Sequence, residues 1–110
     1  MILVKINCQG KGGRNQELAL SAVLRMQEVG LRDVVLASVG TDGTDGPTDA
    51  AGAIVYGGIV NEDTVSDAKE CLRNHDTYRF FERTQSLVMT GPTGTNVADI
   101  CITLIPNCHS

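Results

Sequence analysis

Residues 10–17 place glycines, cations and amides in the order Gly-Lys-Gly-Gly-Arg-Asn-Gln-Glu. Glycines allow the backbone to approach a ligand closely, and a helix-forming run follows at once. The free N–H groups at the start of a helix bind anions, and Arg14 adds a guanidinium. We predict an anion-binding corner here. The predicted ligand contacts are Gly12, Gly13 and Asn15. The alternative left open by the spacing is a plain strand-to-helix turn whose glycines serve packing alone.

This corner differs from the two common nucleotide-binding motifs. In a Walker A motif the lysine follows the last glycine, whereas Lys11 lies between glycines. In a dinucleotide-binding motif a third glycine belongs where Asn15 stands, and an acidic residue should end the second strand. The nearest acidic residue, Asp42, lies beyond Gly40. The pattern therefore disfavours an oxidoreductase that uses a nicotinamide dinucleotide.

A second loop, residues 40–49, carries the carboxylates of Asp42, Asp45 and Asp49 among glycines and threonines. Hard cations prefer oxygen ligands, but the spacing does not fit an EF-hand. Asp-Gly pairs are also ordinary turn residues. We predict a ligand-binding role for Asp42 and Asp45 and assign no residue as a direct metal ligand.

A third loop, residues 90–96, brings hydroxyls, an amide and backbone N–H groups together, which suits phosphate or hydroxyl-rich ligands. The predicted contacts are Thr93, Gly94, Thr95 and Asn96. A plain hairpin connection is the alternative.

A basic corner, an acidic loop and a hydroxyl-rich loop are together typical of phosphoryl transfer, in which cations neutralise the phosphoryl group and carboxylates hold Mg²⁺. A second cation and a clear general base are missing, and we expect His75 and His109 to be surface or capping residues.

The elements that position these loops can be predicted from hydrophobic periodicity. An alternating strand over 2–8, a helix over 15–29 ended by Gly30, and an apolar strand over 34–39 form a βαβ unit. The apolar run also predicts a strand covered on both faces, as in parallel sheets. Short strands are expected over 53–56, 87–90 and 100–104. Helices are expected over 62–73, capped by Asn61, and over 77–83, capped by Asp76. The predicted fold is α/β, a mixed sheet built around the βαβ unit. We expect its three glycine-rich loops to lie at one edge of the sheet.

Composition limits the classes of protein that fit. A chain of 110 residues is one domain or part of one, and a net charge of −4 argues against a nucleic-acid partner. No stretch approaches the ~20 apolar residues of a membrane span. We find no signal peptide, so we expect a cytoplasmic protein, an organelle not being excluded. The cysteine spacing fits no zinc module, and we expect free thiols.

Four segments resemble the C-terminal domain of class II glycerate kinases, which is called MOFRL. They are residues 10–20, 40–52 and 90–96, together with Asp-Thr-Tyr-Arg-Phe-Phe at 76–81. The resemblance covers nearly the whole chain in order. It implies a single MOFRL-like domain over residues 1–110 that forms the C-terminal part of a longer two-domain kinase.

The resemblance also implies an activity, ATP-dependent phosphorylation of D-glycerate with Mg²⁺. The site would lie in a cleft between this domain and a larger N-terminal Rossmann-like domain. Arg14 would be the essential arginine that faces the transferred phosphate, and its partner lysine would belong to the other domain. The predicted ligand residues of the second and third loops would line the same cleft.

Two departures from the family pattern stand out. The family has a Gly-Gly-Glu turn just before the first strand, where this chain has Met-Ile-Leu, which suggests a truncated chain. His75 replaces the usual asparagine before Asp76. Two alternatives therefore accompany the kinase. One is a non-catalytic fragment that binds phosphorylated metabolites, and the other is a hydroxypyruvate reductase. Exposed apolar surface where the N-terminal domain should dock would indicate a fragment.

Overall fold

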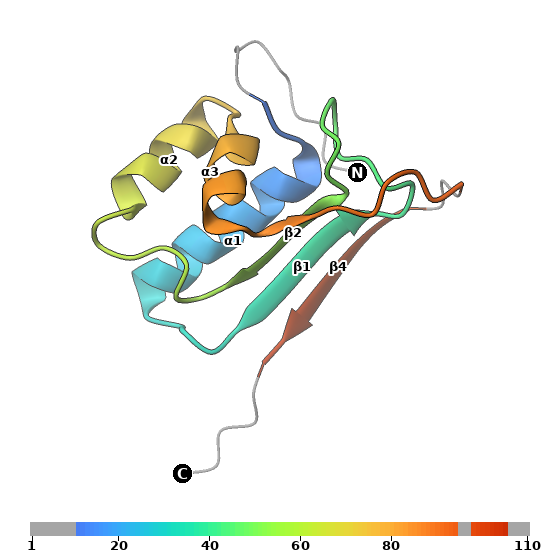
Figure 1. Ribbon diagram of the computed structural model, residues 1–110. Coiled ribbons are helices and arrows are strands. Elements are labelled where there is room, and N and C mark those ends of the chain that lie inside the picture. Colours follow the sequence, from blue (N-terminus) through green and yellow to red (C-terminus); the bar gives the residue numbers. More distant parts are fainter. Residues whose placement is uncertain (1–10, 95–97, 106–110) are drawn as a thin grey trace.

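The computed structural model describes residues 11–94 and 98–105, and the statements below concern these residues. A four-stranded sheet carries three helices on one face (Figure 1). The strands follow the order β3-β2-β1-β4, and each neighbouring pair is antiparallel. In chain order the elements are α1 (Arg14–Val29), β1 (Val35–Gly40), β2 (Gly52–Tyr56), α2 (Val65–Arg73), α3 (Thr77–Thr84), β3 (Leu87–Val88) and β4 (Asp99–Leu104).

The α/β class predicted from the sequence is confirmed, but the sheet differs from the prediction. The strand after α1 was expected to have parallel neighbours and cover on both faces, whereas β1 pairs antiparallel with both β2 and β4. Among the described residues only one of its faces lies under helices. The βαβ unit requires a strand over 2–8, which lies outside the described residues, so that part of the mixed sheet stays a prediction.

Helix α1 forms because its apolar residues recur along one side, and a glycine in the sequence ends it. Ala19, Leu20, Val23 and Met26 are buried on that side. Gly30 ends the helix in the left-handed region at φ 81°, where its N–H and that of Leu31 reach the last carbonyls. The predicted helix end at Gly30 is therefore confirmed.

The hydrophobic core lies between α1 and the sheet and extends under α2 and α3. The buried residues of α1 contact Leu36 of β1 and Val55 of β2. Phe80 and Phe81 of α3 complete the core with their rings edge to face at 5.7 Å. Full burial of each such side chain contributes about 1.5–3 kcal/mol. This core fixes the direction of α1 relative to the end of β1.

Helix α2 begins later than the sequence predicts, whereas α3 begins where predicted but without the expected side-chain cap. Helix α2 begins at Val65 because the side chain of Asn61 accepts the N–H groups of Asp63 and Thr64 and forms a separate turn. Asp76 stands at the N-cap of α3, but its carboxylate makes no capping bond and accepts the N–H of Lys11 instead, at 3.1 Å. That bond fastens the segment before α1 to the start of α3.

Two further predictions concern the cysteines and membrane spans. Cys71 is a buried free thiol and Cys101 an exposed one, whereas Cys8 and Cys108 lie outside the described residues. None of the helices in the described part of the chain is long and apolar enough to cross a membrane.

Candidate functional site

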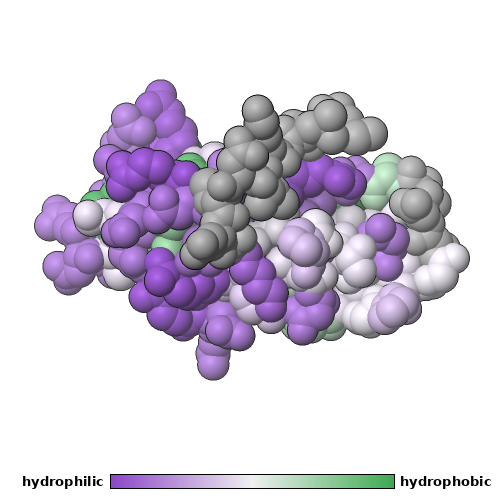
Figure 2. All heavy atoms as spheres, turned by 90° about the horizontal axis from the view of Figure 1, so that it is seen from above, coloured by the Kyte–Doolittle hydropathy of each residue, from purple (hydrophilic) through white to green (hydrophobic). Residues whose placement is uncertain are grey.

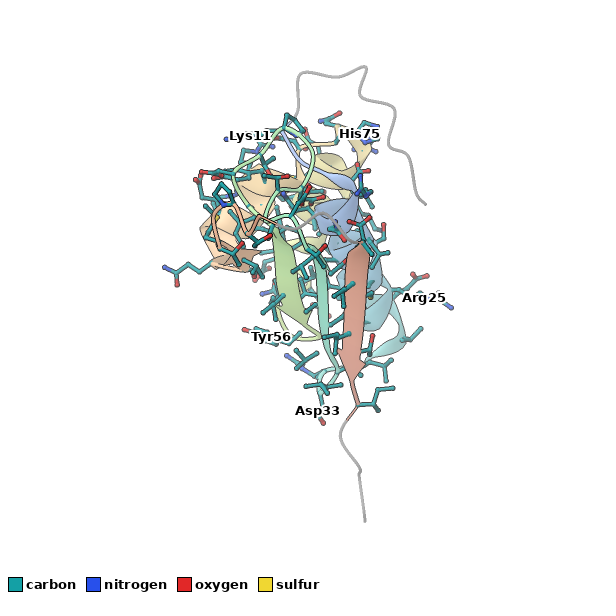
Figure 3. The ribbon with its side chains drawn as sticks, turned by 90° about the vertical axis from the view of Figure 1, so that its right-hand side faces the viewer. Lys11, Arg25, Asp33, Tyr56 and His75 are labelled. Atoms are coloured by element: carbon teal, nitrogen blue, oxygen red, sulfur yellow. The ribbon has the colours of Figure 1, made fainter. Side chains whose placement is uncertain are left out.

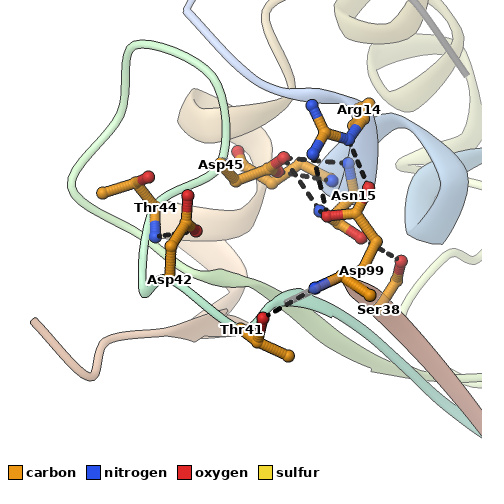
Figure 4. A network of polar contacts seen from close by, with 10 residues as sticks. Arg14, Asn15, Ser38, Thr41, Asp42, Thr44, Asp45 and Asp99 are labelled. Atoms are coloured by element: carbon orange, nitrogen blue, oxygen red, sulfur yellow. Dashed lines mark hydrogen bonds and ion pairs between the residues drawn. The ribbon is translucent and has the colours of Figure 1, made fainter. Parts of the chain in front are cut away.

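The carboxylate of Asp45 lies against the N-terminus of α1 (Figure 4). Its Oδ1 accepts the N–H of Asn15 at 2.9 Å, and its Oδ2 accepts the N–H of Gln16 at 2.8 Å. An aspartate from the second loop therefore caps a helix that begins about 30 residues earlier in the chain. Burial raises the pKa of Asp45, and the hydrogen bonds from Asn15 and Gln16 oppose that shift. Two of the N–H groups predicted to bind an anion ligand are thus already occupied.

Gly12 and Gly13 leave room for neighbouring side chains. A Cβ at Gly13 would lie 2.4 Å from Cγ of Asp45, and a Cβ at Gly12 would lie 2.3 Å from the hydroxyl of Thr77. Both distances are far below contact, so only glycine allows the capping loop and α3 to approach. The packing explanation of these glycines therefore has a direct structural basis. Among the described residues, the N–H groups of Gly13 and Arg14 have no hydrogen-bond partner, which leaves them available to a ligand.

Arg14, the predicted catalytic residue, is held by Asp99 at the start of β4. Nε and Nη2 of the guanidinium donate to the two carboxylate oxygens of Asp99, the second at 3.0 Å (Figure 4). The hydrogen bonds from Arg14 lower the pKa of Asp99, and the same pair raises the pKa of Arg14. A two-point contact of this kind fixes the plane of the guanidinium. The Arg14 side chain remains 40% exposed, so it can still meet an anion from solvent.

Asn15 connects the cap to this ion pair. Its Nδ2 donates to Asp45 at 3.2 Å and to Asp99 at 3.1 Å, and its Oδ1 accepts the hydroxyl of Ser38 at 2.8 Å. Asn15 is buried. The predicted ligand role of Asn15 is not tested by these contacts, but its polar atoms already have protein partners. Its clear function in this fold is to hold α1, β1 and β4 together.

The three aspartates of the second loop lie in different environments. Asp45 is the cap just described, and Asp49 accepts the phenol of Tyr78 at 2.8 Å. Asp42 accepts the N–H of Thr44 at 3.1 Å through one oxygen. The described residues bring no three potential metal ligands together. Asp42 and Asp49 each accept one of these hydrogen bonds, whereas both oxygens of Asp45 are engaged.

The second and third loops touch each other. The hydroxyl of Thr93 donates to the carbonyl of Thr41, and the N–H of Thr93 lies 3.4 Å from the carbonyl of Asp42. A Cβ at Gly43 would lie 2.1 Å from the carbonyl of Gly91. The structure therefore places Thr93 beside Asp42. Gly94 follows in the same loop, and Thr95 and Asn96 lie outside the described residues.

Sequence analysis did not identify Asp99 or the surroundings of His75. The pairing of Asp99 with Gly40 places its side chain on the helix-covered face of the sheet, within reach of Arg14. A single polar residue before an alternating strand was the only sequence signal. His75 Nδ1 contacts Glu17 Oε1. Beside Arg14, these two residues help line an open hollow of about 380 Å³.

Figure 2 views the molecule from above the orientation of Figure 1. Strongly hydrophilic residues gather over the helical side, and the surface becomes paler toward the glycine-rich loops. The ammonium group of Lys11 packs on Tyr78 beside the corner, with Nζ 4.0 Å from the ring centre. Arg14 is therefore the main cation that the described residues present at the start of α1.

Comparison with known proteins identifies the family. Residues 2–99 match the MOFRL family. The chain belongs to that family. It is 49% identical over 105 residues to the D-glycerate 2-kinase of Thermotoga maritima, a match covering 94% of this chain and 25% of the kinase. It is 42% identical over 109 residues to the mouse glycerate kinase, covering 93% of this chain and 21% of the kinase.

A solved structure agrees with these matches. The crystal structure of the Thermotoga maritima glycerate kinase superposes with a TM-score of 0.84 at 47% identity. The match covers 94% of this chain and 25% of that protein. This MOFRL chain thus spans about a quarter of the length of the relatives that it matches.

Proposed function

We propose that this MOFRL chain is the C-terminal part of a glycerate kinase, which transfers the terminal phosphoryl group of ATP to D-glycerate. The similarity to glycerate kinases along nearly the whole chain carries the proposal. The remainder of the enzyme would be a larger N-terminal domain of the Rossmann type. The site would lie in the cleft between the two parts, and the predicted cytoplasmic location belongs to this proposal.

Arg14 would stabilise the charge that spreads over the phosphoryl oxygens in the transition state. The ion pair with Asp99 supports this role, because it orients the guanidinium before a ligand arrives. The N–H groups of Gly13 and Arg14 would bind another oxygen of the phosphate or the carboxylate of glycerate. In the transfer, the bond from the γ-phosphorus to the bridging oxygen of ADP breaks as a bond to a glycerate hydroxyl forms. That hydroxyl loses its proton to a base.

The described residues offer too few potential ligands to hold Mg²⁺ by themselves, so the cation would be held mainly by the nucleotide phosphates. Mg²⁺ commonly takes one or two protein carboxylates together with substrate phosphates and water. Asp42 is the candidate for such a contact, with Thr93 beside it. Asp45 is a poor candidate, because both of its oxygens accept hydrogen bonds from α1. When bound, Mg²⁺ would neutralise charge on the phosphates and so weaken the bond to the leaving group.

Of the two alternatives, the hydroxypyruvate reductase is the less favoured. In dinucleotide-binding folds the pyrophosphate lies on the N-terminus of the first helix. Here Asp45 accepts two of those N–H groups, those of Asn15 and Gln16, so they cannot hold a pyrophosphate. A titration with NADH separates this alternative from the kinase. The non-catalytic binding fragment differs from the kinase only in turnover, so an activity assay separates those two.

The decisive experiment reconstitutes the enzyme and follows it by ³¹P NMR. This chain is mixed with the part of the Thermotoga maritima kinase that it does not match, and MgATP and D-glycerate are added. We expect a phosphoglycerate signal that Arg14→Lys reduces by about 10²-fold or more, because a point charge replaces a planar two-point donor. Arg25→Lys is the matched control, since Arg25 is an exposed arginine of the same helix paired with Glu28. Equal rates for the Arg14 variant and the control would refute the role of Arg14. Absence of turnover with both parts folded and associated would favour the binding fragment.

A further inference from the structure

The sheet has an apolar face that no described element covers. On this side, partners across β2, β1 and β4 form two rows, Tyr56–Val35–Leu104 and Ile54–Ala37–Ile102. Cross-strand partners point to the same face of a sheet. Tyr56 is 54% exposed, Ile102 53% and Leu104 63%. In a compact domain such residues belong in a core.

The opposite face of the same strands shows what covered residues look like here. Leu36 and Val55 alternate with the exposed residues and are buried under the helices. Figure 3 looks onto the exposed face, with the strands in front of the helices and Tyr56 near the end of β2. The strand residues that point to this side carry no charge in the described part of the chain. Monomeric proteins rarely leave a contiguous apolar surface of this kind open to water.

We propose that this face, defined by Val35, Ala37, Ile54, Tyr56, Ile100, Ile102 and Leu104 and called the open sheet face below, is the docking surface for the rest of the polypeptide. The partner is the part that corresponds to the remaining three quarters of the glycerate kinases. It contributes an apolar layer that turns the helix–sheet pair into a three-layer unit.

Two observations favour this occupant over a second copy of the chain. The matched relatives are about four times as long as the region shared with this chain, so each relative carries this domain on the same polypeptide as a larger body. A tethered partner acts at an effective concentration of about 1 mM, above that of most free copies. The position of this face also favours this occupant, because Ile100 on the open sheet face directly follows Asp99, which holds Arg14. A body docked on this face therefore contacts β4 one residue away from Asp99.

The inference does not depend on catalysis, so its test needs no turnover. The chain contains two tyrosines, Tyr56 on the open sheet face and Tyr78 beside Lys11. Labelling with 3-fluorotyrosine gives two ¹⁹F signals, which Tyr56→Phe assigns. A soluble nitroxide broadens the signal of an exposed ring, and the unlabelled remainder of the Thermotoga maritima kinase adds no ¹⁹F signal. We expect the Tyr56 signal to be broadened in the free chain and to shift and lose that broadening when the partner is added.

Charged substitutions test whether the open sheet face makes the contact with the partner. Ile102→Lys should weaken the association by about tenfold or more, because a charge would be buried at the centre of the interface. Val29→Lys is the matched control, since Val29 is 50% exposed at the end of α1 rather than on this face. The control should change the affinity by less than about twofold.

Each other outcome overturns the proposal. Protection of Tyr56 in the free monomer would mean that another segment of this chain covers the face. Protection that appears only as the chain is concentrated alone, and that Ile102→Lys removes, would identify a second copy. A complex in which Tyr56 stays accessible, or no complex between two folded parts, would place the docking surface elsewhere. A phosphoglycerate signal in a mixture with an exposed Tyr56 would refute this inference and leave the kinase proposal standing.

Discussion

Replacement of Asp45 by asparagine should destabilise the fold, because Asp45 caps α1 with both of its oxygens. The carboxylate accepts three N–H donors, the backbone groups of Asn15 and Gln16 and the side-chain amide of Asn15. An asparagine side chain has one acceptor oxygen, so its NH₂ group must face one of those donors. Asn at an ordinary N-cap is tolerated, but here one buried N–H would lose its acceptor.

The magnitude follows from these contacts. A buried donor left without a partner costs about 1–3 kcal/mol, and a lost cap costs about 1 kcal/mol. We therefore expect Asp45→Asn to lower the free energy of unfolding by about 2–3 kcal/mol. An unfolding entropy of about 2 cal/mol/K per residue converts this to a fall in Tm of about 10 °C for a chain of this length.

The measurement is thermal and urea unfolding of the chain, followed by far-UV circular dichroism. Asp42→Asn is the matched control, because Asp42 belongs to the same loop and accepts a single N–H, that of Thr44, at an exposed position. The control should change stability by less than about 0.5 kcal/mol. If Asp45→Asn melts within 2 °C of the control, about half a kcal/mol by the same conversion, the capping argument is wrong.

Further predictions concern the glycine corner and the ion pair. Gly13→Ala should destabilise by about 1–3 kcal/mol, since its Cβ would overlap the Asp45 side chain, and Asp45→Ala should relieve part of the loss in a double-mutant cycle. Gly30→Ala is the control, because Gly30 has a left-handed φ but open space around it, and it should lower the free energy of unfolding by only about 1 kcal/mol. If urea unfolding shows equal losses of stability for Gly13→Ala and Gly30→Ala, the overlap argument is wrong. The ion pair with Arg14 lowers the pKa of Asp99. Its contribution to the free energy of unfolding is therefore fully present above the unfolded pKa of 3.8 and is lost as pH falls through the lower folded pKa. The stability difference between wild type and Asp99→Asn should shrink over that acidic range, and a difference constant down to pH 2 would refute the ion pair with Arg14 as its source.

The local elements of this protein could be predicted because their signals lie within a few residues. The period of apolar residues in α1 and the glycine that ends it act through neighbouring turns. The strand after α1 and the α3 helix were predicted within one residue of their observed bounds. The start of α2 was predicted too early, since Asn61 can cap a turn as well as a helix, and sequence alone does not distinguish the two.

The glycine-rich corner, with Arg14 exposed at the start of a helix, was determined by the sequence itself, because glycine content and helix periodicity are local properties. What the carboxylates do was decided only by the tertiary structure. Asp45 and Asp49 have similar neighbours in the chain, yet one caps α1 and the other accepts the phenol of Tyr78. Asp99 reaches Arg14 because antiparallel pairing aligns it with Gly40 at the end of β1. These contacts join residues 29 to 85 positions apart, and which oxygen meets which donor depends on how the core orients α1 over the sheet.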